Sequence, residues 1–321
     1  MRNNSQPLVF MYSGQGSQSY QMGAELYKTN TVFRHWMEAA DQQAQHWLHI
    51  SILNELYNPN NGAATPFDET LFTHPAIFAV QYAMTQVLQS EGICPDIVMG
   101  ASLGEFGAAA IAGVISFDQA LELICLQAQI LDTYSAHSGG MLAVLAPINT
   151  YESTALIREN TTLAAINTEE HFVISGTMAN LRRVERYLGE QRITCQMLPV
   201  KHAFHSPLMD SLAPSYMPVL ERSLFNPPKI PLVFCSQANH VEIVVADSFW
   251  GSIRGPIRIL ETMGELESRS SYRYLDIGPS GTLANFAKLN CLSTSNSSTL
   301  SCMNPFANAL DQLNRTISAL R

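Results

Sequence analysis

A serine between two glycines is the first feature of this sequence with a chemical meaning. The stretch "GASLGEF", Gly100 to Phe106, has the spacing Gly-x-Ser-x-Gly. The apolar run "DIVMG" before it predicts a strand, and the small apolar residues after it predict a buried helix. At such a junction the glycines allow a sharp turn that exposes Ser102 Oγ, and the Leu103 amide points toward a developing oxyanion. The pattern indicates a nucleophilic serine, although it also occurs in ordinary glycine turns.

A serine hydroxyl needs a base within hydrogen-bond reach, and that base is almost always histidine. The chain has nine histidines, and any one of them taken alone is more often a residue without a catalytic role. His202 and His205, in "KHAFHSPLMD", are the best candidates because they follow a predicted strand and lead back into the main domain. The residues alone leave the choice between these two histidines open.

The predicted elements around Ser102 favour a parallel sheet with helices. An apolar strand over 8–12 runs into a glycine-rich loop. Helices are predicted near 22–27, over 76–90 and over 116–135, the last of them with a serine cap. Further strands are predicted at "IPLVFCS" and "YLDIGPSG". The serine is therefore expected at the end of a core strand.

Residues 139–200 predict an inserted small subdomain. This segment alternates strand, helix, strand, strand, helix and strand, which is the order of a ferredoxin-like unit. Residues 1–138 and 201–321 are then expected to form one main catalytic domain. Within it, the serine-rich, uncharged stretch 292–302 is expected to be a loop of the kind that rarely orders itself.

The composition excludes several classes of function. A chain of 321 residues with 46% hydrophobic content can bury a large core, and its net charge of -9 argues against a general nucleic-acid binder. The six cysteines have no regular spacing, so neither a metal site nor a disulfide framework is indicated. The apolar run near the N-terminus is too short for a signal peptide or a membrane span. We expect a cytoplasmic protein that binds neither nucleic acid nor membrane.

Several motifs in register resemble the malonyl-CoA:acyl carrier protein transacylase family, which includes the acyltransferase domains of polyketide synthases. They are "VFMYSGQGSQSYQMGAELY", "FTHPAIFAVQYAM", "GASLGEFGAAAIAGVISFDQALEL", "AAINTEEHFVISG", "HAFHSPLM" and "DIGPSGTL". The resemblance extends from Leu8 to about Leu289 and implies an α/β-hydrolase-like main domain. It also implies no bound cofactor, and substrates carried on the phosphopantetheine of an acyl carrier protein or on CoA. The partners would be carrier protein domains of a polyketide synthase, and we expect a monomer.

The resemblance assigns catalytic roles by position. Ser102 matches the acylated nucleophile, and His205 matches its base in a dyad without a carboxylate. The backbone amides of Gln15 and Leu103 match the oxyanion hole. Ser252 matches the position, usually glutamine, whose main-chain carbonyl orients the histidine.

Three pocket positions depart from the family. Gln127 replaces an arginine that pairs with the free carboxylate of malonyl groups, and losing such a pair costs on the order of 2–5 kcal/mol. Ala101 replaces histidine, and His74 replaces glutamine. Asn167 and Phe204 match family residues near the pocket. Because the dyad is intact, these changes indicate an altered substrate, with uncharged acyl groups such as acetyl favoured over malonyl.

A carrier protein is usually acidic, so an acidic enzyme needs a local cationic surface to bind it. Arg182, Arg183 and Arg186 share one side of a predicted helix, and Arg254 and Arg258 lie near Ser252. For each arginine taken singly, a solvated surface is an equally good interpretation.

Three functions stay open. The first hypothesis is an acyl hydrolase that removes stalled acyl groups from carrier proteins in polyketide biosynthesis, with water as acceptor. The second is a transferase that loads malonyl or acetyl units, and Gln127 argues against malonyl. The third is a catalytically silent carrier-binding protein. The residues do not distinguish water from a thiol as acceptor.

Overall fold

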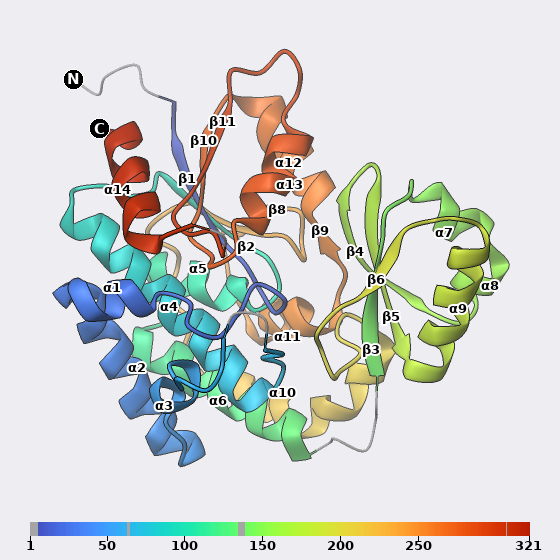
Figure 1. Ribbon diagram of the computed structural model, residues 1–321, viewed down its shortest axis with the longest axis horizontal. Coiled ribbons are helices and arrows are strands. Elements are labelled where there is room, and N and C mark those ends of the chain that lie inside the picture. The colour runs from blue at the N-terminus through green and yellow to red at the C-terminus, as the bar shows by residue number, and fades with distance from the viewer. Residues whose placement is uncertain (1–5, 63–64, 134–138, 306) are drawn as a thin grey trace.

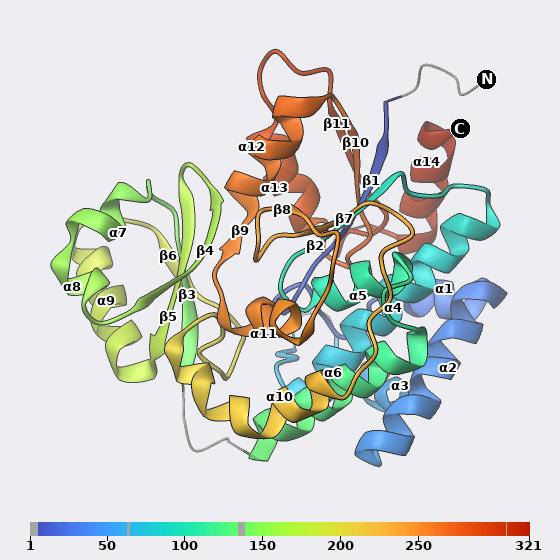
Figure 2. The same cartoon turned by 180° about the vertical axis from the view of Figure 1, so that it is seen from behind.

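The chain folds around two sheets that lie side by side. The structure is a computed structural model that describes residues 6–62, 65–133, 139–305 and 307–321. The larger sheet has the strand order β11-β10-β1-β2-β7-β8, and the smaller has the order β6-β3-β5-β4-β9. Figures 1 and 2 show the smaller sheet and its helices to one side of the larger unit.

The larger sheet is parallel except at one edge, where β7 and β8 pair antiparallel. Its strands are β1 (Leu8–Tyr12), β2 (Ile97–Gly100), β7 (Leu232–Phe234), β8 (Asn239–His240), β10 (Arg273–Asp276) and β11 (Ser298–Ser301). Every residue of β1 is buried, and alternate side chains enter two different core clusters. A strand buried on both faces explains the uninterrupted apolar run at this place in the sequence.

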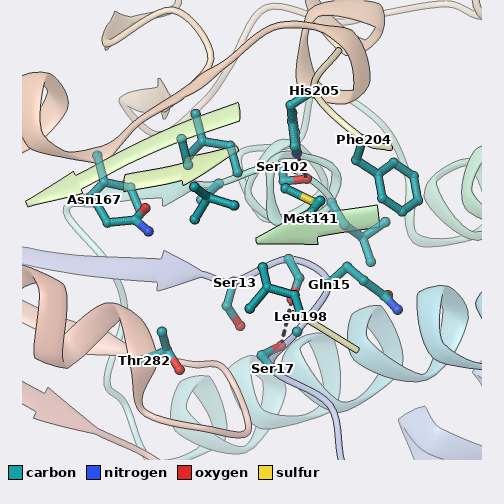
Figure 3. A pocket seen from close by; sticks show the side chains of 18 of the residues that line it. Ser13, Gln15, Ser17, Ser102, Met141, Asn167, Leu198, Phe204, His205 and Thr282 are labelled. Carbon is teal, nitrogen blue, oxygen red and sulfur yellow. Dashed lines mark hydrogen bonds between the residues drawn. The ribbon is translucent and has the colours of Figure 1, made fainter. Parts of the chain in front are cut away.

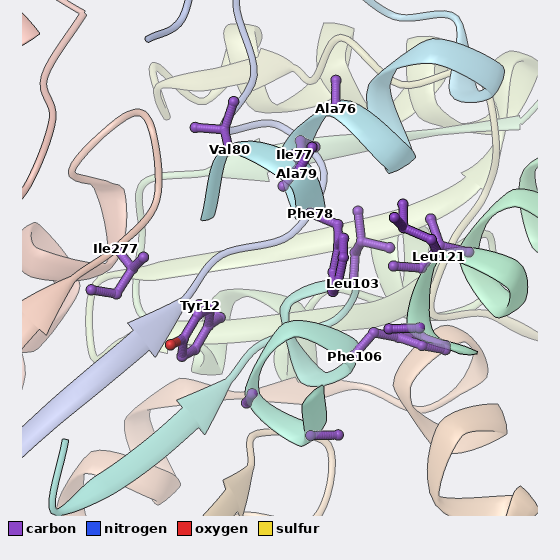
Figure 4. Close-up of a cluster of buried hydrophobic side chains, with 14 of the residues drawn as sticks. Tyr12, Ala76, Ile77, Phe78, Ala79, Val80, Leu103, Phe106, Leu121 and Ile277 are labelled. Atoms are coloured by element: carbon purple, nitrogen blue, oxygen red, sulfur yellow. The ribbon is translucent and has the colours of Figure 1, made fainter. Parts of the chain in front are cut away.

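Helices cover both faces of the larger sheet. Phe10 and Tyr12 pack with residues of α2, α4, α5 and α6, and Figure 4 shows part of this cluster around Phe78 and Phe106. Val9 and Met11 pack on the other face with residues of α12 and α13. The helices of this unit are α1 (Ala24–Thr29), α2 (Thr31–Leu48), α3 (Ile52–Leu56), α4 (Thr70–Ser90), α5 (Gly104–Ile111), α6 (Phe117–Thr133), the 3₁₀ helix η1 (Pro207–Leu212), α10 (Ala213–Glu221), α11 (Ala246–Arg254), α12 (Ile259–Arg269), α13 (Thr282–Asn290) and α14 (Ala309–Leu320).

The smaller sheet has ferredoxin-like topology. Its strands are β3 (Gly139–Val144), β4 (Thr162–Thr168), β5 (His171–Thr177), β6 (Cys195–Met197) and β9 (Ile257–Arg258). The first four, all from one continuous segment, are antiparallel, and α7 (Asn149–Ser153), α8 (Ala155–Arg158) and α9 (Met178–Glu190) alternate with them. The expected α/β class with a ferredoxin-like subdomain is confirmed. The boundary between 138 and 139 stays a prediction, because residues 134–138 lie outside the described residues.

One prediction about local structure was wrong. The stretch 292–302 contains a strand, β11, that extends the main sheet beside β10. Ser297 Oγ anchors this stretch, since it accepts from the Tyr272 amide at 2.7 Å and donates to Glu267 Oε1 at 2.7 Å. The smaller sheet also gains a strand from outside the predicted subdomain, because β9 pairs parallel with β4. Composition and local pattern do not report such distant partners.

No helix within the described ranges is long and apolar enough to cross a membrane.

Candidate active site

The chain between β2 and α5 forms a strained turn around Ser102. The φ angle of Ser102 is +56°, a left-handed conformation that costs a non-glycine residue energy. The two glycines of the motif are required by close approach. A Cβ on Gly104 would collide with the Tyr12 carbonyl, and one on Gly100 would collide with the backbone of Glu105. The predicted nucleophile turn is thus present, with α5 packed directly against β1.

Ser102 and His205 form the expected dyad. Ser102 Oγ lies 2.8 Å from His205 Nε2, and His205 Nδ1 lies 2.7 Å from the Gly255 carbonyl oxygen. Since a carbonyl oxygen only accepts, Nδ1 carries the proton and Nε2 is free to accept from the serine hydroxyl. Burial lowers the pKa of His205 to about 4, against a raising contribution from the Gly255 hydrogen bond. The imidazole is therefore neutral near pH 7 and able to act as a base.

The other candidate base, His202, does not take part in the dyad. Its ring packs edge-on against Phe204, with the centroids 5.6 Å apart. Burial lowers the pKa of His202 as well. The sequence alone did not show which of the two histidines contacts Ser102, and in the structure it is His205.

The sequence predicted that Ser252 carries the carbonyl that orients His205, but the structure places the Gly255 carbonyl there. Helix α11 ends at Arg254, and the next residue, Gly255, is extended, so its carbonyl leaves the helix and meets His205 Nδ1. The His205 amide also donates to the Ile253 carbonyl at 2.9 Å. The segment that follows α11 therefore carries the orienting carbonyl three residues beyond the expected position.

Ser252 instead binds a buried glutamate that the sequence interpretation did not single out. The Glu105 side chain has no exposed surface, and it accepts hydrogen bonds from Ser252 Oγ, from the Ser236 amide (2.8 Å) and from Ser236 Oγ (2.8 Å). Burial raises the pKa of Glu105 to about 8, while these hydrogen bonds act to lower it. Figure 2 shows α11 near α5, the two helices that this contact joins. The sequence did contain a signal for this residue, because Glu105 is a charged residue directly after Gly-x-Ser-x-Gly in an otherwise apolar stretch.

The loop after β1 lies against the nucleophile turn. A Cβ on Gly14 would come within 2.9 Å of Ser102 Cβ and 3.2 Å of the Leu103 amide nitrogen. Gln15 and Leu103 both line the cavity that contains Ser102, and Figure 3 shows the Gln15 side chain directed away from the serine. The Gln15 carboxamide oxygen accepts from Thr73 Oγ1 at 3.1 Å. The oxyanion-hole role of these two amides stays a prediction.

A cavity of about 360 Å³ opens between the two sheets at the dyad. Met141 and Asn167 of the small subdomain line it together with Ser102 and His205, and Figure 3 shows these side chains. All the residues that the sequence assigned to the pocket line this cavity: Gln127, Ala101, His74, Asn167 and Phe204.

Two polar residues of the cavity wall, Asn167 and His74, differ in their environment. Asn167 pairs through its side-chain nitrogen with His171 Nδ1 at 2.9 Å, and its main-chain oxygen accepts from Asn290 at 2.7 Å. Burial and the neighbouring His202 lower the pKa of His74 to about 3. The His74 ring packs near Phe204, with the centroids 5.7 Å apart. His74 is therefore neutral near pH 7.

The predicted docking arginines lie in two different settings. Arg182, Arg183 and Arg186 are exposed on α9. Arg254 pairs with Asp210 at 2.5 Å, and Arg258 lies 3.8 Å from Glu261. Their role in docking stays a prediction.

Comparison with known proteins places these features in a family. The family model described as acyl transferase domain matches residues 9–280. A polyketide biosynthesis acyltransferase homolog of Bacillus subtilis, PksD, is 41% identical over 97% of this chain and 95% of its own length. The homolog BaeD of Bacillus velezensis is 43% identical over 88% of this chain and 87% of its own length.

Solved structures agree with this placement. The acyltransferase domain from the second module of the salinomycin polyketide synthase matches with a TM-score of 0.86 at 28% identity, over 97% of this chain and 72% of that one. FabD from Acinetobacter baumannii matches with a TM-score of 0.83 over 98% of both chains, and at 22% identity this likeness concerns the fold.

Proposed function

Because the chain belongs to the acyl transferase domain family, we propose that it is an acyl hydrolase of polyketide biosynthesis. It removes short uncharged acyl groups, such as acetyl, from the phosphopantetheine thiol of acyl carrier proteins. Removing them frees carriers that hold a group the assembly line cannot extend. The reaction uses Ser102 and His205 and requires no bound cofactor or metal. We place the enzyme in the cytoplasm, as a monomer.

The dyad geometry supports a two-step mechanism. His205 Nε2 takes the proton of Ser102 Oγ while Oγ attacks the thioester carbonyl carbon. The carbon–sulfur bond then breaks, the leaving thiolate receives that proton, and the acyl group stays on Ser102 as an ester. A water molecule gives a proton to His205 and attacks the ester. The ester bond breaks, Oγ recovers the proton, and the free acid leaves.

Oxyanion stabilisation would come from the main chain. In both steps the carbonyl oxygen becomes negatively charged, and two amide donors lower the energy of that state. Gln15 and Leu103 line the cavity beside Ser102, and Leu103 stands at the start of α5. Their amides are the donors in this proposal.

The lack of cations in the cavity wall is the observation that carries the substrate assignment. None of the described residues that line the cavity is lysine or arginine. Burial lowers the pKa values of His74 and His205 to about 3 and about 4, so both rings are neutral near pH 7. A free carboxylate such as that of malonyl would lose its hydration without meeting a compensating charge. An uncharged acyl group meets no such penalty.

A transferase would form the same acyl-enzyme and pass the acyl group to a second carrier thiol. The cavity disfavours malonyl for this enzyme too, and leaves acetyl possible. A silent carrier-binding protein has no need of a serine 2.8 Å from a neutral histidine, so the dyad geometry favours the two enzymes.

The deciding experiment follows the acyl group in water enriched in ¹⁸O. Carrier protein loaded with acetyl or malonyl is mixed with the enzyme and with a second, unloaded carrier, and intact masses are read over time. Hydrolysis predicts acetic acid with one ¹⁸O, a transient acetyl mass on the enzyme, and slow turnover of malonyl. Ser102→Ala is the control and should show none of these. Acetyl on the second carrier would support the transferase, and an unmodified, inactive enzyme would support the silent protein.

Docking of the carrier is a further part of the proposal. Arg182, Arg183 and Arg186 form an exposed basic group on α9 that suits an acidic carrier. Arg254 belongs to the predicted docking set as well, although it is held by Asp210. Each should be tested by its effect on KM for the loaded carrier, with a small-molecule thioester as the reference substrate.

A further inference from the structure

Three residues that line the cavity, Ser13, His74 and Gln127, each have a buried side-chain polar atom that no described residue satisfies. Gln127 on α6 and His74 on α4 both line it, and they are only 4% and 2% exposed. Gln127 Oε1 and His74 Nδ1 have no hydrogen-bond partner within the described part of the chain. Buried polar atoms are nearly always paired in folded proteins, because stranding one is costly. Such atoms on residues of one substrate cavity indicate a ligand group that pairs with them, and the two on Gln127 and His74 belong to positions that the sequence assigned to the acyl pocket.

The donor and acceptor properties of the Gln127 and His74 side chains favour a hydroxyl group as their partner. A carboxamide presents an oxygen that accepts or a nitrogen that donates, and a neutral imidazole nitrogen does either, depending on its tautomer. A hydroxyl donates and accepts, so it can pair with either residue, whichever group that residue presents. A ketone only accepts, and an alkyl group does neither. A carboxylate only accepts, and it brings a charge that this cavity does not balance.

The rest of the wall makes the polar pair selective. Met141, Leu198 and Phe204 are among the apolar residues that line the same cavity. A few fixed polar groups in an apolar cavity determine how a ligand is oriented and which ligands are accepted. A volume of about 360 Å³ also leaves room for an acyl chain longer than acetyl.

We propose that Gln127 and His74 form a subsite for a hydroxyl group on the acyl chain, so that hydroxyacyl thioesters are preferred over unsubstituted ones of the same size. The proposal rests on the proposed function, because it concerns the acyl group that Ser102 accepts. It concerns selectivity, which can be measured on acylation alone.

The test compares a hydroxyl with a methyl group at the same carbon. Carrier protein is loaded with 3-hydroxybutyryl or 3-methylbutyryl, and in parallel with 2-hydroxybutyryl or 2-methylbutyryl. The kcat/KM for release and the rate of Ser102 acylation are measured by intact mass. We expect at least one hydroxyacyl group to be preferred about 3- to 10-fold, the usual range for a neutral hydrogen bond. In Gln127→Leu the ratio of kcat/KM for the hydroxyacyl group to kcat/KM for its methyl analogue should fall to one or below. In Met141→Leu this ratio should stay at the wild-type value.

Every outcome decides the proposal. Equal rates for hydroxyl and methyl in the wild-type enzyme overturn it, because water or the phosphopantetheine arm would then satisfy the two atoms. If Ser102 is acylated faster by the hydroxyacyl group but the acyl group is released only slowly, the subsite is supported and the proposal of a hydrolase is overturned. Absence of any acylation overturns both. If Gln127→Leu does not fold, as judged by its melting temperature, His74→Phe replaces it and should also lose the preference.

Discussion

Replacing Glu105 by leucine should impair both folding and acylation of Ser102. The Glu105 carboxyl accepts from the Ser236 amide, from Ser236 Oγ and from Ser252 Oγ, and leucine accepts nothing. Ser252 Oγ keeps a second acceptor, the Ser248 carbonyl, at 3.1 Å, and Ser236 is partly exposed, so its hydroxyl can reach water. The stranded group is the Ser236 amide, and we expect a loss of about 1–3 kcal/mol in the free energy of unfolding.

The effect on acylation follows from the position of Ser252. Ser252 lies in α11 just before the Ile253 and Gly255 carbonyls, which both bind His205. Without the contact to Glu105, the end of α11 can shift relative to α5 and carry His205 away from Ser102. A misplacement near 1 Å can cost about 100-fold in rate, and we expect a decrease of about 10- to 100-fold.

Glu105→Gln is the matched control. Because burial raises the pKa of Glu105 to about 8, the carboxyl is mostly protonated at pH 7, and a carboxamide resembles it in shape and charge. The variant should acylate at nearly the wild-type rate at pH 7.

The raised pKa of Glu105 also means that the folded state holds this proton more tightly than the unfolded state does. Its stabilising contribution is therefore complete below pH 4.5 and is lost as the pH rises through about 8, in the wild type only.

The assay combines urea unfolding with single-turnover acylation by acetyl-loaded carrier, read by intact mass well below the melting temperature. A purely structural glutamate would lower stability without slowing acylation of the folded protein. The reasoning is refuted if the leucine variant acylates at the wild-type rate, or if the glutamine variant is as slow as the leucine variant.

Three other variants or conditions test the site. Because burial lowers the pKa of His205 to about 4, the acylation rate at pH 5.5 should be close to the rate at pH 7. In a profile of kcat/KM against pH, the rate should fall with a midpoint near pH 4, and a midpoint near 6.5 would contradict this prediction. In Gly104→Ala the new methyl group collides with the Tyr12 carbonyl, so urea unfolding should show a loss of about 1–3 kcal/mol, and an unchanged midpoint would contradict the close packing. Gln127→Arg places a cation in the cavity, so kcat/KM for malonyl-loaded carrier should rise about 10-fold or more, and no rise would refute the argument from cavity charge.

The sequence predicted those parts of the site that depend on local geometry. The turn at Ser102 needs only a strand, two glycines and a helix start, and all of these are adjacent in the chain. The choice of His205 over His202 came from the family resemblance, since its contact with Ser102 joins positions 103 residues apart. The cavity residues were likewise assigned by matching positions, and the structure brings them together.

The parts that the sequence did not predict depend on where elements end and what they meet. The orienting carbonyl belongs to Gly255 because α11 stops at Arg254 and the next residue is extended. Strands β9 and β11 are short and exist only through pairing with β4 and β10. Helix α2 is different, since the buried residues Phe33, Met37, Ala40 and Ala44 recur at helical spacing, a signal that was available in the sequence.

In the proposed mechanism, catalysis and substrate choice depend on different parts of the chain. His205 is held by the main-chain carbonyls of Ile253 and Gly255, and the proposed oxyanion donors are main-chain amides. No side chain besides the dyad itself takes part in these contacts. The side chains at 74, 101 and 127 line the cavity without bonding to either member of the dyad. Replacing them can therefore change which acyl group is accepted while the nucleophile and its base stay in place, and this is why an intact dyad beside three altered pocket positions indicates a changed substrate.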